Sequence, residues 1–440
     1  MKPGSRISIL IGLILPALFF VSDARAQSIP KGLEKINHIV VLFLENHSFD
    51  NLYGQFCGAD GLMNARHVTQ IDSAGHPFTY LPAVPGNKAF PPDLPNNYFN
   101  IDQYVPPDMK IPDLVHRYYQ EQAQIDGGRM DRFAAISDSR GLTMGYYNTD
   151  QLLLAAEAKN YTLCDHMFHS VFGGSFLNHI WLVAAASPVF KHAPAADKAQ
   201  LDANGHLIRD GFVTPDGYAV NTCWSVNSPH PTWPIKPEDL VPSQTMPTIG
   251  DRMNQKHVSW AWYSGGWNDA LAGKPDKSFQ FHHQPFTYFA NYADNTPGRA
   301  AHLKDETEFF KAAQAGTLPS VSFVKPIGIE NEHPGYADIV TGEKHVQQLI
   351  EAVRNGPNWK DCVIIVTYDE NGGFWDHVAP PVIDKKWGPG SRIPGIIISP
   401  FAKRGWVDHT QYETVSILAL IEKRWGLKPL NFRDRKANYF

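Results

Sequence analysis

The chain has 440 residues, of which 43% are apolar, and its formal net charge at pH 7 is -5. This length fits one large α/β domain or two packed domains, and it allows a core large enough to hold buried catalytic groups. The small net charge and the lack of a dense run of Lys and Arg argue against a nucleic-acid partner.

The N-terminal sequence is typical of a secretory signal peptide. Lys2 and Arg6 precede the apolar run ISILIGLILPALFFV, and an A-x-A pattern ends at Ala26. We therefore predict a signal peptide over residues 1–26 and a periplasmic or secreted protein. The alternative is a membrane anchor, but the apolar run is shorter than the roughly 20 residues that a transmembrane helix needs. No later stretch is long and apolar enough to span a bilayer.

The rest of the chain alternates strand patterns with helical patterns, which predicts an α/β sheet. Residues 341–357, TGEKHVQQLIEAVRNGP, have apolar positions spaced for a crossover helix that ends at Gly356-Pro357. The later strands are nearly continuous in apolar character, as expected where both faces of a sheet are covered. The predicted strands are HIVVLFLE (38–45), VSWAWYSGG (258–266), SVSFVKP (320–326), DCVIIVTYDE (361–370) and IPGIIISPF (393–401).

Two stretches, residues 80–113 and 187–245, are rich in Pro and polar residues and show little periodicity. We expect long irregular excursions from one core there, and loops of this length often shape the mouth of a site. The four cysteines contain no C-x-x-C pair, which argues against a cysteine zinc site. Export would permit two disulfides, in any of three pairings. The alternative for Cys164 and Cys362, which have apolar surroundings, is that they are small buried residues.

Polar pairs follow two of the predicted strands. Glu45-Asn46 follows the first, and Asp369-Glu370 follows the fourth, just before Gly372-Gly373. In open α/β sheets, ligands bind outside the carboxyl ends of the strands. Either pair alone would be an ordinary solvated strand end, but together they offer four oxygen donors for a metal ion.

A candidate nucleophile lies in SVFGGSFLNHIWLVAAAS, where the turn Gly173-Gly174-Ser175 opens an apolar helix. At a helix N-terminus the dipole and the free N–H groups favour a phosphate or an alkoxide. The alternative is that Ser175 only caps the helix. Among the 19 histidines, His116, His282-His283 and His333 could contact phosphate and protonate a leaving group. Asp376-His377 lies a few residues beyond the acidic pair and is predicted to orient ligands or histidines.

The segment IVVLFLENHSFDNLYG resembles the opening motif of a bacterial phosphoesterase family that contains secreted acid phosphatases and phospholipases C. Similar motifs continue through DLVHRYYQEQ, FGGSFLNH, FHHQPFTYF, ENEHPGYADIV, VIIVTYDENGGFWDHV and RIPGIIISPF, so the resemblance covers most of the mature chain. It implies an alkaline-phosphatase-like fold, a three-layer α/β sandwich with a mostly parallel central sheet. It also implies a single phosphoesterase domain over residues 27–440.

The resemblance implies roles for particular residues. One divalent metal (Zn, Ca, Mg, Mn or Fe) would be held by Glu45, Asn46, Ser175, Asp369 and Glu370. Ser175 would attack phosphorus, the alcohol would leave, and water would hydrolyse the phosphoserine, with the metal lowering the serine pKa. The active-site histidines would be His116, His283 and His333. The residues that surround the metal ligands and active-site histidines, or that contact phosphate, would be Asn178, His179, His282, Asp376 and His377.

The form GGSFLNH points to the acid phosphatase branch, because the phospholipase C branch usually carries G-T-x-P-N-R. Here Asn178 is kept, and His179 stands in place of the arginine. We therefore predict a phosphomonoesterase acting on phosphate-ester small molecules, with a phospholipase C or other phosphodiesterase acting on phospholipid head groups as the alternative. A non-catalytic phosphate or metal binder remains a third hypothesis. A sulfatase is disfavoured, because the C/S-x-P-x-R context is missing.

Overall fold

The computed structural model describes Met1 and residues 29–440. The predicted signal peptide over residues 1–26 therefore lies outside the described residues, apart from Met1. A nine-stranded sheet forms the centre of the molecule, in the order β12-β4-β11-β10-β1-β9-β7-β8, with β13 also pairing β4. Its strands are β1 His38–Leu44, β4 Thr162–Phe168, β7 Trp260–Ser264, β8 Leu303–Asp305, β9 Val321–Lys325, β10 Cys362–Tyr368, β11 Arg392–Ile398, β12 Trp406–Asp408 and β13 Tyr412–Glu413.

The sheet is mostly parallel, as predicted. β11 pairs antiparallel with both β10 and β4, whereas the other paired strands of the sheet run parallel. The carboxyl ends of β1, β4, β9 and β10 consequently lie at one edge of the sheet. Every residue of β10 is buried, and so is every residue of β1 after its first. Because successive side chains of a strand point to opposite faces, both faces of the sheet are covered.

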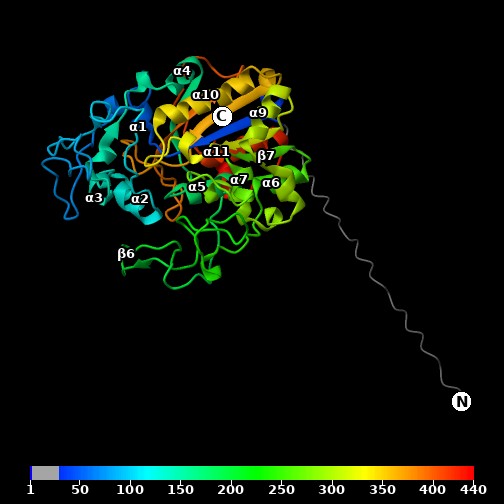
Figure 1. Cartoon of the computed structure of the whole chain (residues 1–440), viewed down its shortest axis with the longest axis horizontal. Helices are drawn as coiled ribbons and strands as arrows, with labels where there is room; N and C mark the ends of the chain where they lie inside the picture. Colours follow the sequence, from blue (N-terminus) through cyan, green and yellow to red (C-terminus); the bar gives the residue numbers. More distant parts are fainter. Residues whose placement is uncertain (2–28) are drawn as a thin grey trace.

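Helices surround the sheet. The labels α4, α9 and α10 lie in the upper part of Figure 1, and α5, α6 and α7 lie in the lower part. The α-helices are α1 Phe49–Tyr53, α2 Tyr118–Ile125, α3 Phe133–Ile136, α4 Leu154–Asn160, α5 Ser175–Ala184, α6 Ile249–Gln255, α7 Trp267–Leu271, α8 Pro297–His302, α9 Glu306–Ala315, α10 Ile339–Arg354, α11 Thr414–Trp425 and α12 Phe432–Lys436.

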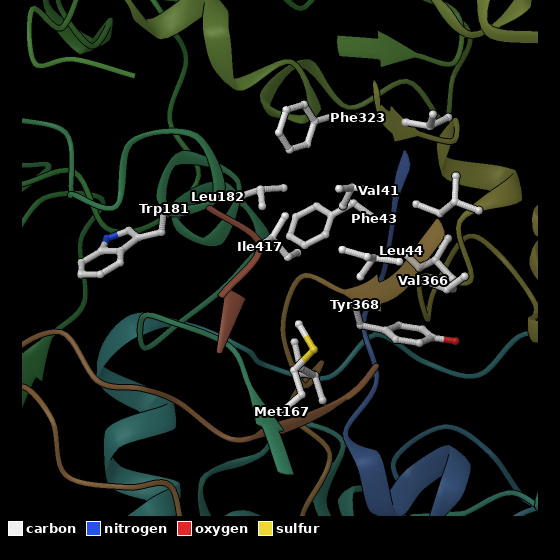
Figure 2. Close-up of a cluster of buried hydrophobic side chains, with 14 of the residues drawn as sticks. Val41, Phe43, Leu44, Met167, Trp181, Leu182, Phe323, Val366, Tyr368 and Ile417 are labelled. Carbon is white, nitrogen blue, oxygen red and sulfur yellow. The ribbon is translucent and has the colours of Figure 1, made fainter. Parts of the chain in front are cut away.

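The core holds the central strands rigidly. Figure 2 shows Phe43 of β1, Leu182 of α5 and Ile417 of α11 in one buried cluster, with Val366 of β10 beside Leu44. Fully burying a Leu, Ile or Phe side chain stabilises a fold by about 1.5–3 kcal/mol. This packing therefore holds in place the strands that precede the candidate ligands.

The five predicted strands and the crossover helix, α10, are confirmed. β4 was not predicted, because Asp165 and His166 interrupt its apolar pattern. Both predicted excursions are mostly irregular. The exceptions are the short strands β2 Phe99–Asn100, β5 Gln200–Leu201 and β6 Leu207–Arg209 and a 3-10 helix over Pro237–Asp239; β2 pairs with β3 Gly145–Tyr146. Figure 1 shows the excursion that carries β6, in green, projecting from the body below α5.

All four cysteines lie among the described residues and are free, so neither of the two possible disulfides forms. Cys164 and Cys362 are buried, which confirms the alternative of small buried residues. Among the described residues, no helix has both the length and the apolar character needed to cross a membrane.

Candidate active site

Both predicted polar pairs and the predicted nucleophile meet at the carboxyl edge of the sheet. β1 and β10 are parallel neighbours that end in register, so Glu45-Asn46 and Asp369-Glu370 follow them side by side. All four of these residues are fully buried. The Ser175 hydroxyl oxygen lies 3.4 Å from Asn46 Oδ1 and 3.5 Å from Glu370 Oε1. One member of each pair, Asn46 and Glu370, therefore faces the Ser175 hydroxyl.

A tight turn positions Ser175. Gly173 has φ 94, and a Cβ at this position would lie 2.7 Å from the backbone of Tyr118, so only glycine fits without rearrangement. Gly174 is the N-cap of α5, and Ser175 is its first helical residue. The alternative that Ser175 serves only as the N-cap is therefore wrong. Its hydroxyl lies at the helix N-terminus, where free N–H groups favour negative charge.

A cavity of about 390 Å³ opens over Ser175. His116 and His333 line it, with ring centroids 5.6 Å apart. His116 Nε2 lies 3.8 Å from Glu370 Oε1. His282 also lines the cavity, whereas His283 is not among its lining residues. Three of the four candidate histidines thus share a cavity with the candidate nucleophile.

His283 does not line the cavity and contacts Glu45 instead. Lys325 Nζ lies 2.6 Å from Glu45 Oε1, His283 Nε2 also contacts Glu45 Oε1, and Tyr336 donates to Glu45 Oε2 at 3.0 Å. Burial opposes ionisation of Glu45, but His283 and Lys325 outweigh it and hold the Glu45 pKa well below its usual range. Direct contact with His283 and Lys325 thus holds the Glu45 carboxylate in place.

The charges of the cluster favour a divalent cation. Lys325 pairs with Glu45. Among the described residues, no other Lys or Arg forms a salt bridge with any of the carboxylates Glu45, Asp369 and Glu370. Burial raises the pKa of Asp369 and of Glu370 well above the usual range, and the charge of Glu45 adds to the effect. Asp369 Oδ2 is buried with no hydrogen-bond partner in the described part of the chain. A bound divalent ion would favour the ionised form of all three carboxyl groups, and three carboxylates beside one ammonium would leave a charge of two for the ion to balance, so these residues fit a divalent ion.

Several groups of side chains have spacings that suit a metal. In one, ligand atoms of Glu45, His179 and His283 lie within 4.8 Å of one another. The His179 ring stacks on His283 with centroids 4.9 Å apart, and its Nδ1 lies 2.7 Å from the Ser175 carbonyl oxygen. His179 is fully buried and does not line the cavity. It therefore supports α5 and His283 from below.

Asn178 holds the turn before Ser175. Its side-chain amide donates to the Gly173 carbonyl at 2.9 Å, and its Oδ1 accepts from Val171 N at 3.4 Å. The side chain is fully buried and does not line the cavity. Its contacts are those of a positioning residue for the nucleophile rather than of a phosphate ligand.

Asp376 and His377 lie in a different network. Arg392 Nε donates to Asp376 at 3.0 Å, and Arg392 Nη2 donates to Asp50 at 3.0 Å. His377 Nδ1 lies 2.6 Å from Asp50 Oδ2, and its Nε2 lies 3.3 Å from Asp60 Oδ1. Asp50, Asp376 and His377 have a spacing that could itself suit a metal, but none of them is among the predicted ligands beside Ser175. The pair therefore anchors α1 through Asp50 rather than contacting those ligands directly.

Two residues in contact with Glu45 were missed by the sequence analysis. Lys325 ends the buried strand β9, and it is fully buried. A charged residue at the end of an apolar strand is the same signal that singled out Glu45, so Lys325 could have been found. Tyr336 carries no such signal, because its stretch has no strand pattern. Its ring stacks on His333 with centroids 4.2 Å apart.

Over most of its length, the chain is similar to bacterial proteins named phospholipase C. The chain is 23% identical to the non-hemolytic phospholipase C of Pseudomonas aeruginosa, over 91% of this chain and 55% of the relative. It is 25% identical to phospholipase C A of Mycobacterium tuberculosis, over 90% of this chain and 74% of the relative. The chain thus spans about half the length of the Pseudomonas protein and about three quarters of the mycobacterial one.

Solved structures with partial similarity include a protein in the alkaline phosphatase superfamily from Vibrio parahaemolyticus. It has a TM-score of 0.37 and 9% identity, over 76% of this chain and 74% of that one. A phosphonate monoester hydrolase from Silicibacter pomeroyi has a TM-score of 0.32 and 10% identity, over 66% of this chain and 71% of that one. The sequence profile of the Phosphoesterase family matches residues 36–428. This chain belongs to the Phosphoesterase family.

Proposed function

We propose that the chain is a secreted, metal-dependent phosphomonoesterase that works through a phosphoserine at Ser175. The observation that carries this proposal is the position of Ser175. It is the first residue of α5, it lines the cavity, and its hydroxyl faces Asn46 and Glu370. A pure binding protein would not need a hydroxyl there. A phospholipase C is the second candidate, supported by the names of the relatives.

The proposed reaction has two steps. Ser175 Oγ gives its proton to a neutral histidine of the cavity and forms a bond to phosphorus while the bond from phosphorus to the ester oxygen breaks, and the ester oxygen takes up a proton as the alcohol departs. Water then loses a proton and attacks phosphorus, the bond from phosphorus to Ser175 Oγ breaks, Ser175 regains its proton, and inorganic phosphate is released. The backbone N–H groups of the first turn of α5 stabilise the negative charge of the transferring group in both steps.

His116 and His333 are the candidates for proton transfer, because both line the cavity that holds Ser175. A histidine in its protonated form gives a proton to the departing alkoxide, and its neutral form then takes one from the attacking water. We assign His282 to phosphate contact on the same ground. His283 is assigned to holding Glu45 in place, because it contacts that carboxylate and does not line the cavity.

Glu45, Asn46, Ser175, Asp369 and Glu370 would hold the divalent ion. Such an ion supplies positive charge that lowers the pKa of a serine hydroxyl and neutralises a phosphoryl group. Lys325 and Tyr336 keep Glu45 oriented by direct contact. Oxygen ligands accept Zn, Ca, Mg, Mn or Fe. Metal analysis of the purified protein would identify which of these ions it binds.

Two substrates separate the candidate functions. The purified protein is assayed on p-nitrophenyl phosphate, a monoester, and on p-nitrophenylphosphorylcholine, a diester. Faster turnover of the monoester supports the phosphomonoesterase, and turnover of the diester alone supports the phospholipase C. Ser175→Ala should lose activity on both substrates, whereas Ser73→Ala, at an exposed position, should retain it. Full activity in Ser175→Ala would refute the serine mechanism.

A further inference from the structure

A second cavity, of about 350 Å³, lies within the excursion over residues 187–245. Its lining is mainly apolar and aromatic, with Asp197, Lys236 and Asp239 among the remaining lining residues. We call it the apolar side cavity. Its main apolar lining residues are Phe190, Phe212, Val213, Trp224, Trp233 and Ile235.

The apolar side cavity adjoins the cavity over Ser175. Val220, Asn221 and Thr222 line the cavity over Ser175, and the chain continues from Thr222 to Trp224 along the apolar side cavity. Thr222 lines both cavities. The Trp224 ring also lies 6.3 Å, centroid to centroid, from the His282 ring, which lines the cavity over Ser175. One short segment therefore forms a common wall.

Large aromatic surfaces are exposed beside this cavity. Trp233 is 57% exposed and Phe212 is 43% exposed, although both side chains are apolar. The Trp233 ring lies 6.1 Å from the Trp224 ring, centroid to centroid, in an edge-on arrangement. Aromatic side chains offer large apolar areas with few rotatable bonds, so they lose little entropy when a ligand covers them.

We propose that the apolar side cavity binds the apolar part of the alcohol esterified to the phosphate. This inference rests on the proposed function, because it places the phosphate at Ser175 and the alcohol beyond Thr222. The two carboxyl groups of Asp197 and Asp239 outnumber the one ammonium group, Lys236, in the lining, which disfavours a second phosphate there. The cavity therefore suits a substrate with one phosphate and a hydrocarbon group. Substrates with longer hydrocarbon chains are therefore the better ones.

Each methylene group added to the hydrocarbon chain should raise kcat/KM. Burying one methylene group contributes about 0.8 kcal/mol, which corresponds to about a fourfold rise in kcat/KM. A series of n-alkyl monophosphates from ethyl to hexyl should show this rise per carbon as an upper limit. The same alcohols presented as phosphorylcholine esters give a parallel series in case the protein prefers diesters. These short chains stay dissolved as single molecules, so binding to lipid aggregates does not contribute.

The test variant is Trp233→Ala, which removes a half-exposed side chain and should leave the fold intact. The matched control is Trp406→Ala, which removes a tryptophan of similar exposure on β12, at the sheet edge. We expect Trp233→Ala to flatten the dependence on chain length while ethyl phosphate hydrolysis and inhibition by inorganic phosphate stay as in the wild type. Trp406→Ala should keep the wild-type dependence, and thermal unfolding checks the fold of both variants.

The outcomes distinguish this inference from the proposed function. Hydrolysis that is equally fast for ethyl and hexyl esters in the wild type would overturn the inference and leave the proposed function standing. A chain-length dependence that survives Trp233→Ala would also overturn it, because the hydrocarbon would then bind elsewhere. If the wild type hydrolyses no ester in either series, the proposed function fails first.

Discussion

Replacing Asp369 with asparagine should have opposite effects on the metal-free and the metal-bound protein. Asp369 is fully buried beside Glu45 and Glu370, and Lys325 is the ammonium group that pairs with this cluster. Without a cation, burial holds the pKa of Asp369 well above its usual range, so folding at neutral pH must supply a proton to this carboxyl group, which costs free energy. With a divalent ion bound, the same carboxylate becomes a ligand. Asp369→Asn should therefore stabilise the metal-free protein and weaken metal binding.

The magnitudes follow from burial and binding. A carboxyl group that must bind a proton on folding costs about 1.4 kcal/mol for each unit by which the pH exceeds its unfolded-state pKa, and asparagine avoids that cost. A ligand present at about 1,000 times its Kd stabilises the folded protein by about 4 kcal/mol. Wild type should gain most of that amount when metal is added, and Asp369→Asn should gain clearly less. The order of stability of the two proteins should therefore reverse between chelator and excess metal.

Thermal unfolding in chelator and in excess metal measures both effects. Asp269→Asn is the matched control, because Asp269 is exposed and should behave as wild type in both conditions. A wild-type thermal unfolding midpoint that does not change when chelator is added would refute this prediction. An Asp369→Asn variant that is destabilised equally in chelator and in metal would refute it as well.

The remaining predictions concern three other residues. Glu45→Ala should abolish metal binding and turnover while circular dichroism shows an intact fold; a variant that retains the metal would contradict its assignment as a ligand. His116→Ala should lower kcat about 10²–10⁴-fold on alkyl phosphates and much less on p-nitrophenyl phosphate, whose leaving group needs no proton; equal losses would exclude the acid role. Although burial opposes protonation, Asp50 raises the pKa of His377 above its usual value. The stabilisation from this pair is therefore present below about pH 6.5 and lost as pH rises through the folded-state pKa. The stability difference between wild type and His377→Gln should be larger at pH 5.5 than at pH 8.5 in urea denaturation, and a difference that grows with pH would contradict it.

The site could be predicted where a polar residue interrupts a strong local pattern. Glu45-Asn46 and Asp369-Glu370 follow apolar strands, and parallel neighbours in register bring such strand ends together. Ser175 was marked by the glycine turn before an apolar helix, and α5 begins there. In each case the strand or helix sets the direction of the side chain, so the sequence is enough to predict which residues converge.

Other features depend on tertiary packing and escaped prediction. His282 and His283 are adjacent in a short 3-10 helix, and no periodic pattern shows that His282 lines the cavity while His283 contacts Glu45. β4 was missed because Asp165 and His166 break its apolar run, although they bond to each other and to other polar partners in the fold. The shared wall at Thr222 lies in an irregular segment, whose path no local rule predicts.

Trapping the covalent intermediate shows whether Ser175 is the nucleophile. Wild-type protein is mixed with a phosphate ester, quenched in acid within the first turnover, and analysed by peptide mass spectrometry. We expect one phosphate on Ser175, formed and lost at rates consistent with kcat, and none in Ser175→Ala. Turnover without phosphate on Ser175, or phosphate on another residue at a competent rate, would contradict the serine mechanism.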